Sequence, residues 1–271
     1  MLTASNPDAL GYAGRAGCDP ADLAFRFLVA VDVEGFSRRP AAEQAKAQDD
    51  LEHAMAVATT RAGLDRRGWY RQPRGDGELA VLSPDVNGLT LVADYPRCLA
   101  KALNELNASV NRGSRLRVRL AIHHGAIFPG GPFGPVGMAP VIVSRLVDAQ
   151  VLRQALSQHG DADVALMVSA TVYDEIISSE FHNLNPEMFC RTIFNVKGSR
   201  IVGYLAQRCP GSPDPGIAPE ASQKASVAVP VPTLVAGNRS SRRRRRPPVL
   251  AESDLATPAI QPHALADPRR V

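Results

Sequence analysis

The chain has 271 residues, 45% of them apolar, which is enough to bury the core of one large domain or of two small ones. Its net charge of +4 suggests a nucleic-acid partner, but much of the positive excess lies in a single run, Arg242 to Arg246. No aromatic residues interleave those arginines for base stacking, so we do not expect specific nucleic-acid binding.

The sequence lacks the signals of a membrane or secreted protein. Its first twenty residues show no basic region followed by an apolar one, and no stretch approaches the roughly 18 apolar residues of a membrane span. The four cysteines, Cys18, Cys98, Cys190 and Cys209, lie far apart without a C-x-x-C pair, which argues against a zinc knuckle or a disulfide framework. We expect a cytoplasmic protein without a membrane partner.

Composition divides the chain into three parts. Residues 1–20, rich in Gly, Ala and Asp, predict a flexible leader, and residues 209–271 contain half of the 22 prolines without a hydrophobic period. Such a composition is typical of a disordered tail. Residues 21–208 are therefore expected to form the folded domain.

The first predicted strand contains an acid. The apolar run Phe25 to Val33 predicts a buried strand that stops at Gly35, and Asp32 lies inside it. Pro40 opens a helix that continues to about Arg61, with apolar residues repeated on one face. A buried carboxylate is costly unless something neutralises it, so Asp32 requires a partner.

A hairpin and further alternating elements follow. Two short strands, Trp69 to Gln72 and Glu78 to Leu82, flank the tight turn Gly75-Asp76-Gly77. The later elements are a helix over Tyr95 to Leu106, a strand over Arg115 to Ile122, a Gly- and Pro-rich loop over Gly125 to Gly137, a helix over Val141 to Leu156, a strand over Val164 to Val168, a short helix with a capping-box-like start at Thr171 and Asp174, and strands over Arg191 to Val196 and Ile201 to Leu205. This order predicts an α/β (α+β) fold with a ferredoxin-like βαββαβ core, in which helices cover one face of a mixed, mainly antiparallel sheet.

Asp32 and Asp76 are predicted to lie close together, because the hairpin tip comes beside the strand that carries Asp32. Two convergent carboxylates suit one or two hard cations, Mg²⁺ or Mn²⁺, bound through oxygen atoms. Structural alternatives exist for both residues. Asp32 can pair with an arginine or cap a helix, and Asp-Gly is a common hairpin dipeptide.

Five segments, in this order, resemble signatures of the class III adenylyl and guanylyl cyclases. They are Phe27 to Ser37, an apolar strand followed by Asp, Gly, Phe and Ser; Arg74 to Gly77, a Gly-Asp hairpin; Leu116 to Gly125, a strand that ends in Ile-His-His-Gly; Gly137 to Leu146, in the place of a Gly-any-any-Val-Asn-any-Ala-any-Arg-Leu segment; and Val196 to Gly198, a closing Lys-Gly. Each segment is weak evidence alone. Together they cover nearly all of the middle of the chain and indicate a cyclase catalytic domain.

By this resemblance, Asp32 and Asp76 would hold two Mg²⁺ or Mn²⁺ ions per site, and Arg119 and Lys197 would contact phosphate oxygens of a nucleoside triphosphate. Arg145 matches the family arginine that stabilises charge on the α-phosphoryl group. The family forms its active site between two subunits, so the resemblance also implies a homodimer with two equivalent sites. Taken alone, Arg119 also fits an exposed strand position, Lys197 fits a solvated turn, and Arg145 fits an i,i+4 pair on a helix.

The departures from the family lie in the part that recognises the base and the ribose. Gln72 stands where adenylyl cyclases have a base-contacting lysine, and Gly134 stands where they have a base-specifying acid. Val141 replaces an asparagine that holds the ribose or the transition state, and valine has no hydrogen-bonding group in its side chain. Any base-facing role of these three positions must therefore differ from the one in the family.

Two functions remain open. One is a working cyclase of altered base specificity, like the pyrimidine cyclases of bacterial antiphage defence, which makes a 3′,5′-cyclic nucleotide and pyrophosphate for signalling. Arg71, Gln72 or Arg74 would then face the base. The other is a catalytically silent domain that senses nucleotides or dimerises. We favour the enzyme, because a silent domain has no need to keep two acids positioned for metal, and loss of one transition-state donor costs only about 10²- to 10³-fold in rate.

The neighbouring residues His123 and His124 lie on a predicted strand. Successive side chains on a strand point to opposite faces of the sheet, so these two cannot bind one ion together. We expect both to have packing roles.

Overall fold

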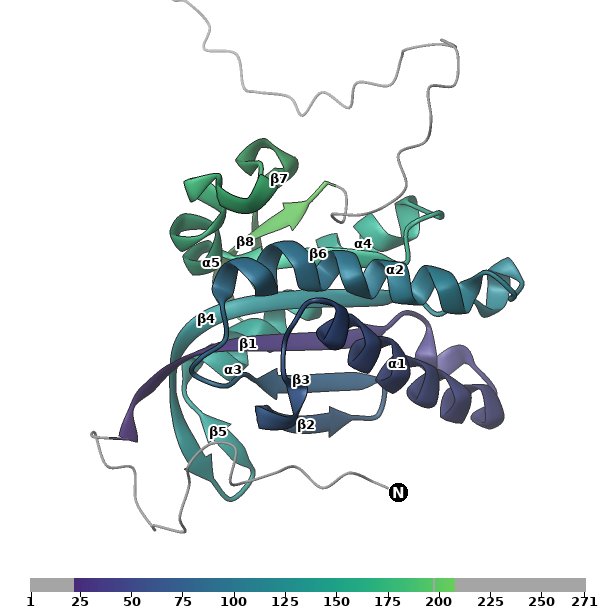
Figure 1. The fold of residues 1–271 in the computed structure, drawn as a ribbon, viewed down its shortest axis with the longest axis horizontal. Helices are drawn as coiled ribbons and strands as arrows, with labels where there is room; N and C mark the ends of the chain where they lie inside the picture. Colours follow the sequence, from purple (N-terminus) through teal and green to yellow (C-terminus); the bar gives the residue numbers. More distant parts are fainter. Residues whose placement is uncertain (1–21, 197, 208–271) are drawn as a thin grey trace, which may run out of the picture. The chain divides into compact units, whose positions relative to one another are not determined.

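A computed structural model describes residues 22–196 and 198–207, all of which belong to the first of the two units of the chain, Met1–Ile217. Figure 1 shows a sheet with helices packed across it. The strands are β1 (Ala24–Val33), β2 (Tyr70–Arg74), β3 (Gly77–Val81), β4 (Val118–Gly131), β5 (Gly134–Val136), β6 (Val164–Ser169), β7 (Phe189–Val196) and β8 (Ser199–Ala206). The helices are α1 (Ala41–Arg61), α2 (Tyr95–Asn107), α3 (Met138–Val147), α4 (Gln150–Gln158) and α5 (Ala170–Glu175).

The strands form one sheet in the order β2-β3-β1-β4-β6-β8-β7, with β5 paired to β4. The first four strands, in the order β2-β3-β1-β4, are antiparallel to their neighbours and are connected as a βαββαβ unit. β4 and β6 are parallel, so the sheet is mixed. The predicted fold class, with its ferredoxin-like core and mainly antiparallel sheet, is confirmed.

Helices cover both faces of this sheet. α1 and α2 pack on the face that includes Val31 and Val33, and in Figure 1 they lie in front of the sheet. α3 and α4 pack on the opposite face, over Leu28 and Ala30. The prediction of helices on one face is therefore right for α1 and α2 and wrong for α3 and α4. Because side chains alternate along β1, Asp32 belongs to the face that α3 covers.

The segment from Gly125 to Gly137 is a hairpin rather than the predicted loop. β4 continues to Gly131 and turns back into β5, with Phe128 opposite Val136. The pairing is irregular between Phe128 and Gly131. Such irregularity accommodates proline and glycine within a strand, which is why a composition typical of loops misled the prediction.

Two helix boundaries also differ from the predictions. The helix expected over residues 141–156 is two helices, because Ala149 adopts a non-helical conformation with ψ 132° between α3 and α4. The side chain of Ser169, rather than Thr171, caps α5 by accepting a hydrogen bond from the amide of Val172. Both differences arise from backbone conformations that leave no mark in the hydrophobic period.

Some predictions fall outside the described residues. These are the leader, the tail from residue 209 with its arginine run, and two of the cysteines. Within the described ranges, Cys98 and Cys190 are free thiols. None of the helices in those ranges combines the length and the apolar character needed to cross a membrane.

Candidate functional site

The hairpin between β2 and β3 brings Asp76 beside Asp32. In the pairing of β1 with β3, Asp32 lies opposite Gly77, and the amide of Val33 donates a hydrogen bond of 2.8 Å to the carbonyl oxygen of Asp76. Gly77 permits this approach, because a β-carbon at that position would lie 1.9 Å from the carbonyl oxygen of Val31. The two predicted metal-binding acids are therefore neighbours in the backbone of the fold.

Arg119 reaches Asp32 from the other side of β1. In the pairing of β1 with β4, Arg119 lies opposite Asp32, and its guanidinium donates to the Asp32 carboxylate in an ion pair. The side chains of Arg119 and Asp32 are only 10% and 13% exposed, so water screens the pair little. The arginine partner considered as an alternative for Asp32 is thus present in the structure.

Burial of the Asp32 carboxyl group nevertheless outweighs the effect of Arg119 on its pKa. Burial raises the pKa of its carboxyl group above the ordinary value, Arg119 lowers that pKa, and the negative charges of Asp76 and Asp148 raise it. The net direction is upward, so these surroundings favour the ionised carboxylate less than water does. A cation bound beside this carboxyl group would lower its pKa, because a nearby positive charge favours the ionised form.

The available ligands fit a divalent cation in part. Asp32 and Asp76 supply carboxylate oxygens, the ligand type that Mg²⁺ and Mn²⁺ prefer. Across the described ranges, no group of three or more acidic, His or Cys side chains is close enough to hold a metal ion. A cation here would therefore complete its coordination with water and with substrate oxygens, as Mg²⁺ commonly does.

Two hydrogen bonds that the sequence did not reveal hold the hairpin tip in place. Gln48 of α1 donates from its side-chain amide to the carbonyl oxygen of Gly75 at 2.7 Å. Arg74 donates from its guanidinium to the hydroxyl of Ser144 on α3 at 3.0 Å. The partners lie 27 and 70 residues apart in the sequence, so no local spacing could have indicated them. The hairpin that carries Asp76 is thereby tied to both faces of the sheet.

Arg145, the predicted catalytic arginine, follows Ser144 on α3 and is partly exposed. It makes no hydrogen bond or ion pair with any other residue that the structure describes, and the i,i+4 pair considered for it is absent because positions 141 and 149 are Val and Ala. Its guanidinium is free to contact a substrate or a partner chain. Val141 lies one helical turn earlier and is also partly exposed.

Gln72 and Gly134, two of the three predicted base-facing positions, meet at the edge of the sheet. The side-chain amide of Gln72 donates to the carbonyl oxygen of Phe133 at 3.3 Å. Gly134 has a φ of +111°, and a β-carbon there would lie 2.6 Å from the hydroxyl of Tyr70. An acidic side chain at position 134 would therefore require Tyr70 to move and would strain the backbone.

Lys197, the second predicted phosphate contact, lies outside the described residues, between β7 and β8. Its role remains a prediction, and so does the phosphate contact of Arg119. The structure thus joins Asp32, Asp76 and Arg119 in one cluster. It ties that cluster to the helix of Arg145 through Arg74.

Known structures share this architecture. The guanylyl cyclase Cya2 matches with a TM-score of 0.51 at 17% identity, over 72% of this chain and 95% of that one. The chain has the fold of a nucleotidyl cyclase domain. A bacterial light-regulated adenylyl cyclase is also similar, with a TM-score of 0.49 at 15% identity over 69% of this chain and 53% of that one. An adenylate/guanylate cyclase/hydrolase from Silicibacter pomeroyi matches with a TM-score of 0.48 at 18% identity over 67% of this chain and 96% of that one. No protein-family model matches the chain, and no curated protein matches its sequence.

The two histidines of the cyclase fold point to opposite faces of the sheet, as predicted. His123 is 4% exposed, and its Nδ1 lies 2.8 Å from the hydroxyl of Ser169. His124 lies 2.9 Å from the carboxylate of Glu175, and its ring packs on Phe27 with the centroids 4.5 Å apart. The two imidazoles share no partner, so they do not form a metal site together.

His123 should make stability depend on pH. Burial lowers its pKa from the ordinary 6.5 to about 4. Between those values the unfolded chain binds the proton and the folded chain does not, so the free energy of unfolding falls as the pH drops from 6.5 to 4, by about 3 kcal/mol. Urea unfolding of the wild type and of His123→Asn at pH 7 and pH 4.5 tests this, with the exposed His53→Asn as control. Equal pH dependence in the wild type and in His123→Asn would contradict the prediction.

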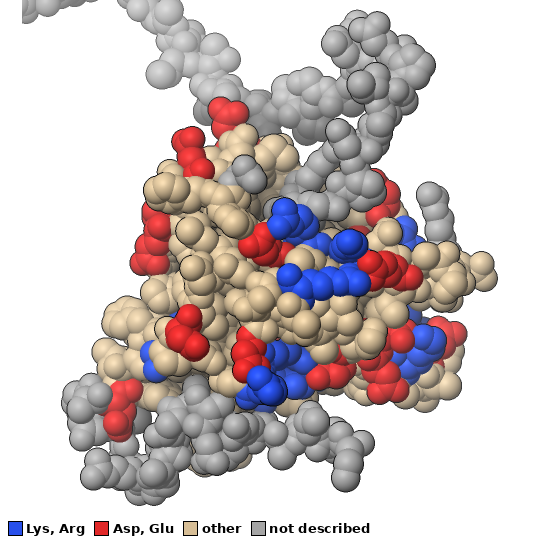
Figure 2. Space-filling view, in the orientation of Figure 1, with Lys and Arg blue, Asp and Glu red and all other residues tan. Residues whose placement is uncertain are grey.

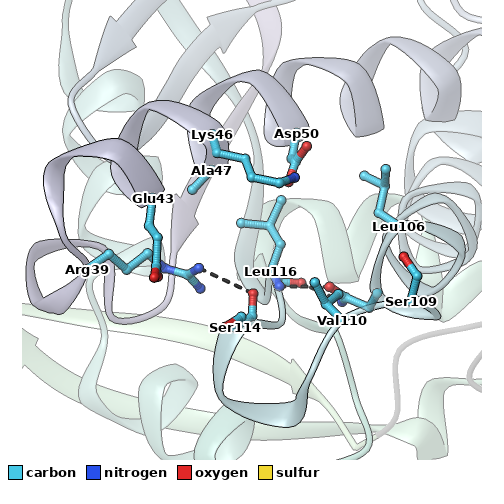
Figure 3. Close-up of a pocket in the computed structure, with 11 residues that line it drawn as sticks. Arg39, Glu43, Lys46, Ala47, Asp50, Leu106, Ser109, Val110, Ser114 and Leu116 are labelled. Carbon is cyan, nitrogen blue, oxygen red and sulfur yellow. Dashed lines mark hydrogen bonds and ion pairs between the residues drawn. The ribbon is translucent and has the colours of Figure 1, made fainter.

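A pocket of about 300 Å³ lies elsewhere in the cyclase fold, between α1 and the segment that links α2 to β4 (Figure 3). Lys46 and Asp50 form an ion pair on its α1 side. Arg39 donates across it to the carbonyl oxygens of Ser114 and Arg115. None of the predicted site residues lines this pocket, so we do not assign it to the reaction.

Charges of both signs are mixed on the face that Figure 2 shows. Lys and Arg side chains interleave there with Asp and Glu over α1 and α2. Ion pairs also form on and beside these helices, among them Arg61 with Glu105 and Arg97 with Asp94. Nucleic-acid binding uses a basic stripe, and this mixed pattern does not supply one.

Proposed function

We propose that the chain is a divergent class III nucleotidyl cyclase of altered base specificity. It would convert a nucleoside triphosphate into a 3′,5′-cyclic nucleotide and pyrophosphate for signalling, in the cytoplasm. The observation that carries the proposal is the adjacency of Asp32 and Asp76, which the pairing of β1 with β3 builds into the backbone. Two acids next to a buried arginine form a site for a polyanion that carries divalent cations.

The reaction needs an oxygen nucleophile and a pyrophosphate leaving group. The 3′-oxygen forms a bond to the α-phosphorus, the bond from that phosphorus to the bridging oxygen of pyrophosphate breaks, and the proton of the 3′-hydroxyl is released to water. Bound Mg²⁺ or Mn²⁺ would favour loss of that proton and neutralise the triphosphate. Asp32 and Asp76 would hold the cations, while Arg119 and Lys197 would bind phosphate oxygens and so orient the triphosphate.

Arg145 would stabilise the charge that develops on the α-phosphoryl group. Its guanidinium has no partner within residues 22–196 and 198–207, which leaves it available for this role. In a homodimer, Arg145 and Lys197 of one chain would face Asp32 and Asp76 of the other. The dimer is part of the proposal.

Base recognition would differ from that of adenylyl cyclases. The amide of Gln72 can donate and accept hydrogen bonds, and it lies beside the hairpin that carries Gly134. Gly134 offers no side chain, and Tyr70 occupies the space that an acid would need. The base would therefore be bound without the acid and lysine pair of adenylyl cyclases.

A second candidate, a catalytically silent nucleotide-sensing or dimerising domain, is favoured by one observation. Arg119 already neutralises Asp32, and no third ligand lies close to the two acids in the described ranges. Such a site could bind a nucleotide without turning it over. This candidate predicts nucleotide binding without product.

A test of the proposal is incubation of purified protein with Mn²⁺ and each of the four nucleoside triphosphates. We expect at least one triphosphate to give a 3′,5′-cyclic nucleotide and pyrophosphate in equal amounts, as measured by chromatography and mass spectrometry. Arg145→Ala should lower the rate on the same substrate by about 10²- to 10³-fold. Nucleotide binding with no product from any of the four would favour the silent domain.

A further inference from the structure

The carboxylate of Asp32 already has a cation within its own chain. The Nη2 of Arg119 donates to the Asp32 carboxylate in an ion pair, and the Nε of Arg119 is buried without a hydrogen-bond partner in the described part of the chain. The whole Arg119 residue is 8% exposed. A buried arginine that engages only part of its donors is not fully satisfied where it stands.

We propose that Arg119 is an internal counter-ion that a divalent cation must displace from Asp32, so that metal and triphosphate bind cooperatively. This inference rests on the proposed cyclase function and concerns how its metal site is loaded. Arg119 would stay in its ion pair with Asp32 until the substrate binds. It would pass to the phosphate oxygens when the cation takes its place.

Competition between the two cations follows from their positions. A metal ion bound to Asp32 and Asp76 would lie close to the Arg119 guanidinium, and both carry positive charge in a site with little water. The two cannot share one carboxylate without repulsion. In the absence of nucleotide, the chain should therefore bind a divalent cation weakly.

The triphosphate provides the second place for Arg119. Guanidinium groups bind phosphate oxygens through paired hydrogen bonds, and Nη2, which donates to Asp32 in the free chain, would supply a donor for such a contact once Arg119 moves. A ligand that attracts Arg119 releases Asp32 and thereby strengthens metal binding. By thermodynamic reciprocity, the metal strengthens triphosphate binding by the same factor.

The alternative is a purely structural ion pair, and the neighbouring charges argue against it. Asp76 also acts on Asp32, and its carboxylate has no hydrogen-bond or ion-pair partner among the described residues, whereas Asp148 pairs with Arg153. The cluster keeps a negative charge after Arg119 is paired. Such a cluster still attracts a cation, which a self-sufficient structural pair would not.

Three chains distinguish these possibilities in the absence of nucleotide. Binding of Mn²⁺ is measured from the free-ion electron paramagnetic resonance signal at pH 8 for the wild type, Arg119→Gln and Arg119→Lys. We expect Arg119→Gln to bind Mn²⁺ about tenfold more tightly than the wild type, within the usual range of coupling between sites. Arg119→Lys keeps the competing charge and should stay close to the wild type. Arg26→Gln, which removes one charge elsewhere on β1, should have no effect.

The outcomes separate this inference from the function on which it rests. Equal Mn²⁺ affinity in the wild type and Arg119→Gln would overturn the displacement and leave the cyclase proposal standing. Absence of Mn²⁺ binding in both chains would overturn the displacement as well, and the assay with the four triphosphates would then decide the proposed function separately. Should Arg119→Gln fail to fold, the ¹⁵N signal of the Arg119 side chain in the wild type decides the matter. Titration with Mg²⁺ should shift that signal, and saturation without a shift would refute the proposal.

Discussion

Asp76→Ala is expected to abolish formation of cyclic nucleotide, with a loss of at least about 100-fold on whichever triphosphate the wild type uses. Asp76 lies at the hairpin tip, where its backbone carbonyl oxygen accepts a hydrogen bond from the amide of Val33. The substitution keeps this backbone contact and removes only the carboxylate. The loss should therefore appear in turnover and in Mn²⁺ binding, while the melting temperature changes little.

The matched control for Asp76→Ala is Asp85→Ala. Asp85 is exposed beyond the other end of β3 and makes no hydrogen bond or ion pair with the residues that the structure describes. Its loss should leave the rate within twofold. Activity that survives Asp76→Ala while Asp85→Ala behaves as the wild type would remove the basis for a two-carboxylate metal site.

Glu78→Ala should cost the fold about 3–5 kcal/mol of unfolding free energy, although Glu78 has no part in the proposed reaction. Its carboxylate accepts hydrogen bonds of 2.9 Å from Arg66 to both oxygens and one of 2.8 Å from Arg71. The side chains of Arg66 and Glu78 are 8% and 7% exposed. Removing Glu78 leaves the buried Arg66 with the half-exposed Glu52 as its one acidic partner among the described residues, besides a weak contact with the sulfur of Met55.

Urea unfolding measures this loss, and two variants control for it. Glu78→Gln keeps the shape but not the charge, so it should lose most of the same stability if the ion pair, rather than packing, is responsible. Asp50→Ala breaks the exposed i,i+4 pair with Lys46 and should cost less than about 0.5 kcal/mol. A loss below 1 kcal/mol in Glu78→Ala would mean that water reaches Arg66.

The strands and helices could largely be predicted because the apolar residues of each element follow the pattern typical of a strand or of a helix. β1 is an apolar run interrupted by Arg26 and Asp32, α1 and α2 repeat apolar residues on one face, and the Gly-Asp-Gly turn fixes the β2–β3 hairpin. Asp32 and Asp76 could be placed together for the same reason, since a hairpin tip must lie beside the strand with which it pairs. These are local signals with direct structural meaning.

The remaining features depend on which strands become neighbours. Arg119 was predicted as a phosphate contact, and an arginine was considered as a partner for Asp32, but only the register of β1 with β4 shows that the two are one pair. Arg66 lies in a short 3-10 helix and Glu78 lies in β3, and no repeat of apolar residues in the sequence indicates that the two side chains pair. The break at Ala149 was missed because neither Gly nor Pro marks it, and a buried alanine fits both a continuous helix and a linker.

The alternation of side chains along β1 has a consequence for how this protein can change over time. Asp32 lies between Val31 and Val33, whose side chains enter the core on the other face. Insertion or deletion of one residue within β1 would exchange these faces, bury the carboxylate in the core beneath α1 and α2, and turn a valine toward Arg119. Substitutions can tune the site one side chain at a time, whereas a change of length in β1 would eliminate both the site and the core in one step.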